Sequence, residues 1–379
     1  MATRTAPRRK APSRSSRRPR RLGKTVVIFG AGATKACGGP LTNEILPDAL
    51  ALKRQLERTG YLALVERFLV KNFNLPPATR RRAGHFPPLP LVLSLVDTAL
   101  DRGDALGREW PPGELRKVRE GLEYLVFALL EHRLHSIGPH YRLFLDGLYE
   151  AEPASVTVIS LNYDIIADNT LARLGESRGK FALPDYRCDI ATAGYRNADR
   201  FGCLLKIHGS LNWLYCPNCH RLELGVAPSG RTVKVLNTLY DLDSRYGATG
   251  APCVECQTRV RPVLITPTHL KDYRNPHIAR VWYEAARALR DAERAIFVGY
   301  SMPEDDVEVI YLFKRGLAKM DPRQITVVEY AGKRRVPVDA HPVGLRYRAL
   351  FGNGIDWHST GFDAWIREAG QVGYVPQPR

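Results

Sequence analysis

The stretch from Cys203 to Cys219 carries two kinds of reactive side chain within a short distance. An apolar run ends in His208-Gly209, which predicts a buried strand that delivers an imidazole to the edge of a sheet. A histidine in that place can serve as a general base. Cys216 and Cys219 follow with two residues between them, a spacing at which two thiolates can bind one metal ion. The segment therefore predicts a base and half of a metal site.

A second pair of cysteines completes the candidate metal site. Cys253 and Cys256 repeat the spacing of Cys216 and Cys219 after a long spacer. Four thiolates can surround Zn²⁺ tetrahedrally and leave no open position for catalysis, so the pattern predicts a structural zinc ion. A redox-active dithiol and unligated cysteines are the alternatives. The chain has seven cysteines, four of them in these pairs, which indicates a reducing compartment.

A glycine-rich turn follows the first predicted strand, Thr25–Phe29. Glycines let a backbone come close to a pyrophosphate, so this turn is a candidate site for a nucleotide cofactor. The ordinary dinucleotide fingerprint has a third glycine where this chain has Lys35. A tight turn without a ligand is therefore the alternative. The candidate residues of the turn are Gly30, Ala31, Gly32, Ala33 and Thr34.

Polar side chains follow other predicted strands, at the end where open parallel sheets bind ligands. The candidates are Asn162 and Asp164 after the second strand, Gly299 and Ser301 after a later one, and Glu329 after Ile325–Val328. Glu329 could accept hydrogen bonds from ribose hydroxyls. An Asx turn that caps the next helix is the alternative for Asp164, and a solvated strand end is the alternative for Glu329.

The order of strands and helices predicts one large domain over residues 24–379. Alternating buried strands and helices are typical of a Rossmann-type, doubly wound parallel sheet of the α/β class. Residues 45–150 have apolar side chains three and four positions apart and predict a helical insert. Residues 212–260 enclose the four cysteines and predict a small zinc-binding module.

The formal charge of +17 comes largely from the amino-terminal tail. Residues 1–23 are rich in Arg, Ser and Pro, lack apolar periodicity and predict a disordered segment. A nucleic-acid-binding arm, a nuclear-type address and an organellar transit peptide are the alternatives. No apolar run reaches the ~18 residues of a membrane span and no secretory pattern is found, so we expect a soluble, cytoplasmic protein without membrane contact.

Taken in order, the motifs resemble the sirtuin family over about residues 24–330, which is most of the chain. The resemblance implies an NAD-binding catalytic domain with a zinc-bearing module. It also implies that Asn162 matches the essential asparagine, His208 the catalytic base and Ser301 a serine that holds a phosphate or ribose of NAD. Gly30 and Gly32 match the pyrophosphate loop. The motifs are Gly30-Ala31-Gly32-Ala33-Thr34, Asn162-Tyr163-Asp164, Ile207-His208-Gly209, the two cysteine pairs and Gly299-Tyr300-Ser301.

Other positions depart from the pattern of a deacylase sirtuin. The chain has Pro40-Leu41-Thr42-Asn43-Glu44 where the family has Pro-Asp-Phe-Arg. It has Ile265-Thr266-Pro267-Thr268 where the family has the Phe-Gly-Glu that leads into the acyl-peptide groove. The positions implied for NAD itself are kept, whereas those near the nicotinamide and the acyl-lysine are changed. The chain thus looks like the bacterial sirtuin-like branch, whose members often hydrolyse NAD in antiviral defence.

The favoured hypothesis is an NAD hydrolase that yields nicotinamide and ADP-ribose. Asn162 and Asp164 would orient the ribose and the attacking water, and His208 would take the proton. An NAD-dependent protein-lysine deacylase is the first alternative, and a zinc-ribbon nucleic-acid-binding protein with an inert NAD fold is the second. Unchecked NAD loss would be toxic, so we expect control by an activating partner at the helical insert or by a homo-oligomer.

Overall fold

The structure is a computed structural model that describes residues 23–134, 138–151, 153–179, 182–192, 199–225, 252–268 and 273–370. Apart from Gly23, the predicted amino-terminal tail lies outside these residues, as does the central part of the predicted zinc module. Within the described residues, no helix combines the length and the apolar character needed to cross a membrane.

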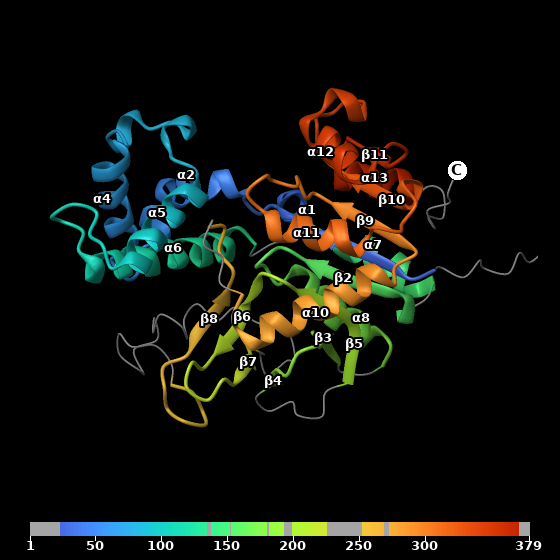
Figure 1. Cartoon of the computed structure of the whole chain (residues 1–379), viewed down its shortest axis with the longest axis horizontal. Helices are drawn as coiled ribbons and strands as arrows, with labels where there is room; N and C mark the ends of the chain where they lie inside the picture. Colours follow the sequence, from blue (N-terminus) through green and yellow to red (C-terminus); the bar gives the residue numbers. More distant parts are fainter. Residues whose placement is uncertain are drawn as a thin grey trace, which may run out of the picture.

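A seven-stranded sheet, parallel throughout, forms the centre of the molecule (Figure 1). Its central strands are mostly apolar and buried, because a parallel sheet is covered on both faces, whereas strands toward its edges contain charged residues. The prediction of a doubly wound parallel sheet is confirmed. In spatial order the strands are β11 (Asp356–His358), β10 (Ile325–Val328), β9 (Arg294–Val298), β1 (Thr25–Phe29), β2 (Val156–Ser160), β5 (Asp199–Lys206) and β3 (Ala182–Asp185).

Helices cover both faces of this sheet. On one face, Phe29 of β1 stacks on Tyr141 with 4.2 Å between the ring centroids, and it contacts Phe362 edge-on. On the other face, Phe297 of β9 contacts Phe313 and Tyr347. The first face carries α1 (Ala31–Ala36), α7 (His140–Ala151), α8 (Ile166–Ser177) and α13 (Phe362–Gly370); the second carries α10 (Pro276–Arg290), α11 (Val307–Gly316) and α12 (Pro342–Phe351).

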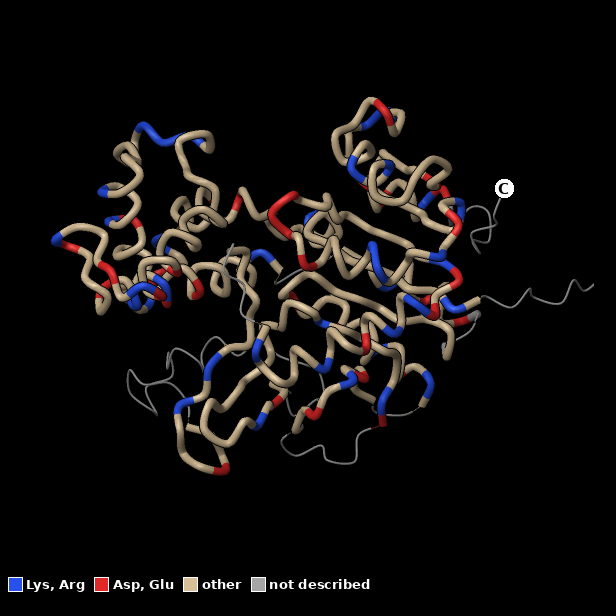
Figure 2. The backbone as a smooth tube through the Cα atoms, in the orientation of Figure 1, with Lys and Arg blue, Asp and Glu red and all other residues tan. Residues whose placement is uncertain are grey.

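Most of the helices between β1 and β2 form a lobe beside the sheet (Figure 1). Its apolar residues recur at helical spacing and pack on one another; Phe68, for example, meets the Trp110 ring edge-on at 5.0 Å. Lys, Arg, Asp and Glu all occur along its backbone (Figure 2). The lobe comprises α2 (Ile45–Ala51), α3 (Lys53–Leu56), α4 (Tyr61–Phe73), α5 (Leu89–Arg102) and α6 (Pro112–Arg133).

A second, four-stranded sheet lies below the first in Figure 1. It begins where the chain leaves β5, because only Ile207 and His208 separate that strand from β6. Gly209 allows this change of direction: its φ is +80°, and a Cβ there would lie 1.8 Å from the carbonyl oxygen of Val263. The strand order is β4 (Ala191–Thr192), β7 (Leu222–Leu224), β6 (Gly209–Tyr215) and β8 (Arg261–Leu264).

The turns after β1 and β9 interlock through their backbones. The amide of Gly32 donates to the carbonyl of Gly299 at 2.8 Å, and the amide of Gly30 donates to Val298 at 3.0 Å. A Cβ on Gly299 would lie 2.3 Å from the nitrogen of Ala33, and one on Gly30 would lie 2.6 Å from the Gly299 oxygen. Close packing of two turns therefore requires these glycines, whether or not a ligand is bound.

We expect Gly299→Ala to destabilise the fold. The residue has φ +63°, and the added methyl group would collide with the β1 turn, so the free energy of unfolding should fall by at least about 2 kcal/mol. Gly147→Ala is the matched control, because that glycine is inside α7 and has open space around it. It should leave stability unchanged or raise it by up to about 1 kcal/mol. Urea unfolding of both variants would show equal midpoints if the interlock were unimportant.

Candidate active site and metal site

The predicted site residues come together at the carboxyl edge of four adjacent strands. β9, β1, β2 and β5 are neighbours, and their ends lead into Gly299, Gly30, Asn162 and His208. Glu329 follows β10, the next strand beyond β9. The chain crosses from β1 to β2 on one side and from β9 to β10 on the other, so the direction of the crossovers reverses between β1 and β9. Open parallel sheets bind ligands at such a point.

Asn162 is held by the turn after β1. Its Nδ2 donates to the carbonyl oxygen of Gly30 at 2.9 Å and to the hydroxyl oxygen of Tyr141 at 3.4 Å. Burial, with the charge of Asp164, raises the pKa of Tyr141 well above its usual range, so this hydroxyl stays neutral. Both amide hydrogens of Asn162 thus have acceptors within the protein. Among the described residues no donor contacts its Oδ1, so this oxygen can accept a hydrogen bond from a ligand.

His208 is buried directly after β5 and is anchored to the residue before Asn162. Its Nδ1 lies 3.2 Å from the carbonyl oxygen of Leu161, so that nitrogen carries the proton and donates it. The tautomer fixed in this way places the lone pair on Nε2, the nitrogen that can act as a base. The imidazole of His208 is therefore bonded to Leu161, the residue next to Asn162.

Asp164 is engaged on both of its carboxylate oxygens. Oδ2 accepts from the hydroxyl of Thr34 at 2.5 Å, and Oδ1 accepts from the amide of Ile166 at 2.9 Å. The second contact is the Asx turn at the start of α8. Burial raises the pKa of this carboxyl group. These contacts tie the loop after β2, residues 161–164 (the β2 loop), to α1 and to α8.

Ser301 and Glu329 lie on the other side of the β1 turn, next to Arg346 of α12. The guanidinium of Arg346 donates to the carbonyl oxygen of Ser301 from Nε at 3.0 Å and from Nη2 at 2.8 Å. The Ser301 side chain is exposed. Burial raises the pKa of Glu329, while its neighbour Arg346 opposes that shift. Ser301, Glu329 and Arg346 thus form a polar border around the glycine turns.

Three residues of this edge were missed by the sequence analysis. Tyr141 and Arg346 are on helices that carry no local motif, and only the packing of α7 and α12 brings them to the edge. Lys206 had a visible signal, because it is a charged residue within the apolar run that precedes His208. Such a residue in a buried strand requires a partner, which the sequence alone could not identify.

The helical lobe contacts the loop that follows β8. Arg119 of α6 donates to the hydroxyl of Thr266 at 2.8 Å and is itself held by Asp97 and Glu123. The hydroxyls of Ser94 in α5 and Thr268 lie 3.3 Å apart. Thr266 and Thr268 are both buried. The lobe therefore covers the segment whose sequence departs from that of deacylases.

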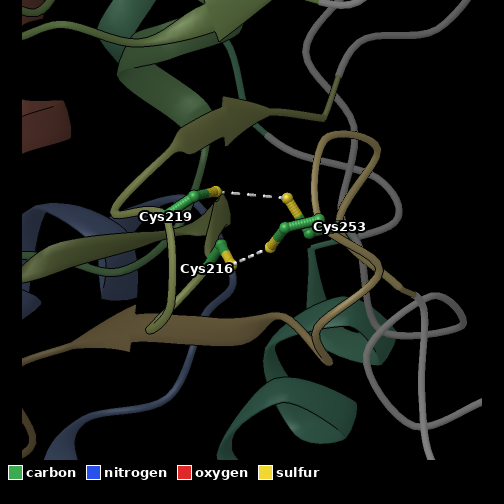
Figure 3. Close-up of side chains that lie close together, drawn as sticks. Cys216, Cys219 and Cys253 are labelled. Carbon is green, nitrogen blue, oxygen red and sulfur yellow. Dashed lines mark hydrogen bonds between the residues drawn. The ribbon is translucent and has the colours of Figure 1, made fainter.

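The four predicted metal ligands meet in space (Figure 3). Their sulfur atoms all lie within 4.8 Å of one another, with 3.4 Å between Cys216 and Cys256 and 3.6 Å between Cys219 and Cys253. None forms a disulfide. A tetrahedral zinc ion with Zn–S bonds of about 2.3 Å would place its sulfurs about 3.8 Å apart, so the four thiols fit a structural zinc ion.

We expect the purified protein to contain about one zinc ion per chain. Cys253→Ser should remove most of this metal and lower the melting temperature, because zinc binding contributes folding energy to such a module. Cys188→Ser is the control, since Cys188 lies outside the cluster. Metal analysis and thermal melts with and without a chelator are the measurements. A metal-free protein whose melting is insensitive to the chelator would exclude a zinc site.

The comparisons with known proteins give structural similarity alone. No family model matches the sequence, and no curated protein matches it. The chain is similar to a Sir2 structure with a p53 peptide and NAD⁺ (14% identity, 92% of each chain, TM-score 0.40). It is also similar to Sir2Tm bound to a propionylated peptide (11% identity, 92% of each chain, TM-score 0.40). With TM-scores below 0.5, function has to be inferred from the side chains of this chain itself.

Proposed function

We propose that this protein hydrolyses NAD at the bond between nicotinamide and ribose. The observation that carries the proposal is the pairing of Asn162 and His208 beside the two interlocked glycine turns. One offers a fixed amide oxygen and the other a base of fixed tautomer. The motifs that surround them are those of the sirtuin resemblance, in the same order along the chain. A base can activate water for hydrolysis of a glycosidic bond, and a fixed amide oxygen can orient the ribose or the water.

The chemistry assigned to the two residues follows from their contacts. Nicotinamide leaves with the electron pair of the glycosidic bond, and water adds to the ribose carbon that it vacates. Nε2 of His208 takes a proton from that water, while Oδ1 of Asn162 accepts a hydrogen bond from a ribose hydroxyl or from the water. Asp164 acts by holding the loop, because both of its oxygens are already bonded within the protein. ADP-ribose and nicotinamide are the products.

The glycine turns are the proposed place for the phosphates of NAD. Of the four backbone amides from Gly30 to Ala33, three already donate to backbone carbonyls. Within the described contacts, the amide of Ala31 is the one that remains to bind a phosphate. Ser301 and Glu329 on the polar border are the proposed partners of the adenosine ribose. Arg346 adds a guanidinium that can face a phosphate.

Water is the preferred acceptor because the helical lobe meets the loop where an acylated peptide would be expected. Thr266 and Thr268 replace the deacylase motif, and their hydroxyls are bonded to Arg119 and Ser94 of the lobe. A peptide strand would have to displace those contacts. Deacylation is kept as the second candidate, since the four-cysteine module and His208 are shared features of the resemblance.

Free hydrolysis of NAD would be harmful to the cell that makes the enzyme. A low basal activity, raised by a partner at the helical lobe or by self-association, fits a role in antiviral defence. The lobe is the proposed surface for such control because it reaches the site through Arg119 and Thr266.

The test is to follow nicotinamide and ADP-ribose after purified protein is mixed with NAD, with and without an acetylated peptide. We expect both products without peptide. His208→Ala should lower kcat about 10² to 10⁴-fold, as for loss of a general base, and Asn162→Ala should lower it by about 10²-fold. His132→Ala is the control, because His132 is exposed on α6.

The outcomes separate the candidate functions. Nicotinamide release that requires the peptide and yields acylated ADP-ribose would establish deacylation. Folded His208→Ala and Asn162→Ala proteins that match the wild type would contradict the assigned roles. A wild-type protein that leaves NAD intact, alone and with peptide, would contradict the proposed function.

A further inference from the structure

A lysine with no exposed surface lies at the end of β5. The Lys206 side chain has 0% relative exposure, as does that of Asp168 on α8, and 3.1 Å separate Nζ from Oδ2. Ammonium and carboxylate groups are rarely buried so completely, and they need further hydrogen bonds to offset the loss of water. Lys206 is two residues before His208, and Asp168 is four residues after Asp164.

The partners of Asp168 come from separate parts of the fold. Besides Lys206, its carboxylate accepts from the hydroxyl of Tyr186, which follows β3, at 2.6 Å. The side-chain amide of Asn212 in β6 donates to it at 3.5 Å. One carboxylate therefore connects the main sheet, the second sheet and α8. Its position is fixed independently of Lys206.

Lys206 also donates from Nζ to the carbonyl oxygen of Asp164. This contact completes a pattern along the β2 loop, residues 161–164. The carbonyl of Leu161 accepts from His208, that of Asn162 from the hydroxyl of Ser160, and that of Tyr163 from the amide of Leu211. All four carbonyls of the loop are thus fixed by the protein. The carbonyl of Asp164 is the one of these four that accepts from a charged group, the ammonium of Lys206.

Stability alone does not explain this ion pair. Two well-packed neutral side chains in place of a buried ion pair often give a protein of equal or greater stability, because the cost of removing two charges from water disappears. An apolar replacement for Lys206 cannot, however, donate to the carbonyl of Asp164. The contact with the Asp164 carbonyl is therefore the feature of Lys206 that two neutral, well-packed side chains would not reproduce.

We propose that Lys206 is a positioning residue: anchored by Asp168, its ammonium holds the β2 loop so that Asn162 faces the reacting ribose. The inference rests on the proposed NAD hydrolysis for its catalytic part. Without Lys206, the carbonyl of Asp164 loses its donor and the loop gains freedom at its carboxyl end. Asn162 then spends less time in the orientation that its contact with Gly30 defines.

The experiment compares Lys206→Met with the double variant Lys206→Met/Asp168→Asn. The double variant removes both buried charges, so Asp168 is not left as a carboxylate without the ammonium of Lys206. The asparagine at position 168 still offers an oxygen to the Tyr186 hydroxyl. We expect kcat to fall at least tenfold in both variants, with KM for NAD changed less than about threefold. The melting temperature should drop in the single variant and recover in the double variant, whereas kcat should not recover.

Hydrogen–deuterium exchange of residues 161–164 is the second readout. We expect faster exchange there in both variants. Arg81→Met is the control, because it removes a half-buried ion pair with Glu66 in the helical lobe, 2.5 Å between nitrogen and oxygen. It should lower the melting temperature and leave both kcat and this exchange unchanged.

Two results would overturn the proposal: recovery of kcat together with the melting temperature in the double variant, or unchanged exchange of residues 161–164 in Lys206→Met. A wild-type protein that fails to cleave NAD would overturn the proposed function instead. In that case the exchange measurement decides the positioning role by itself: faster exchange supports it and unchanged exchange refutes it.

Discussion

The close contact of two backbone turns is the constraint on which the rest of the site depends. Gly30 and Gly299 allow the ends of β1 and β9 to approach until the backbone of one turn bonds to that of the other. The carbonyl of Gly30 then faces β2, where it accepts from Asn162. A side chain at either glycine would separate the turns and move that carbonyl, so the position of the amide follows from the packing of the sheet.

From this contact the site extends strand by strand along the carboxyl edge. The carbonyl of Leu161, the residue before Asn162, accepts a hydrogen bond from Nδ1 of His208 and so fixes the tautomer of that histidine. His208 lies where the chain passes from the large sheet to the small one. The four cysteines lie at the far end of that small sheet, away from the proposed chemistry. We infer that zinc contributes by keeping the second sheet folded, which in turn supports the segment that carries His208.

Local signals predicted the strands, the glycine turns and the cysteine cluster, because these depend on neighbouring residues. Apolar runs identified β1 and β2. The repeated Cys-x-x-Cys spacing identified the two cysteine pairs, Cys216 with Cys219 and Cys253 with Cys256. The partners of Lys206 and Arg119 were beyond prediction, since Asp168 and Thr266 approach them only through tertiary packing. The same holds for Tyr141, which lies within the predicted helical insert, residues 45–150, and yet contacts Asn162. The glycines illustrate a different limit: sequence suggested a phosphate loop, whereas the structure gives a packing reason that applies without any ligand.

The most direct measurement of the central claim is a map of where NAD binds. Hydrogen–deuterium exchange would be measured on the His208→Ala protein with and without NAD. This variant is expected to consume NAD slowly, so the ligand stays intact during the measurement. Binding at the carboxyl edge predicts slower exchange in residues 30–34 and 160–164 with NAD present, and no change around Cys216 and Cys219. Unchanged exchange in both of the first two segments at saturating NAD would contradict the proposed site.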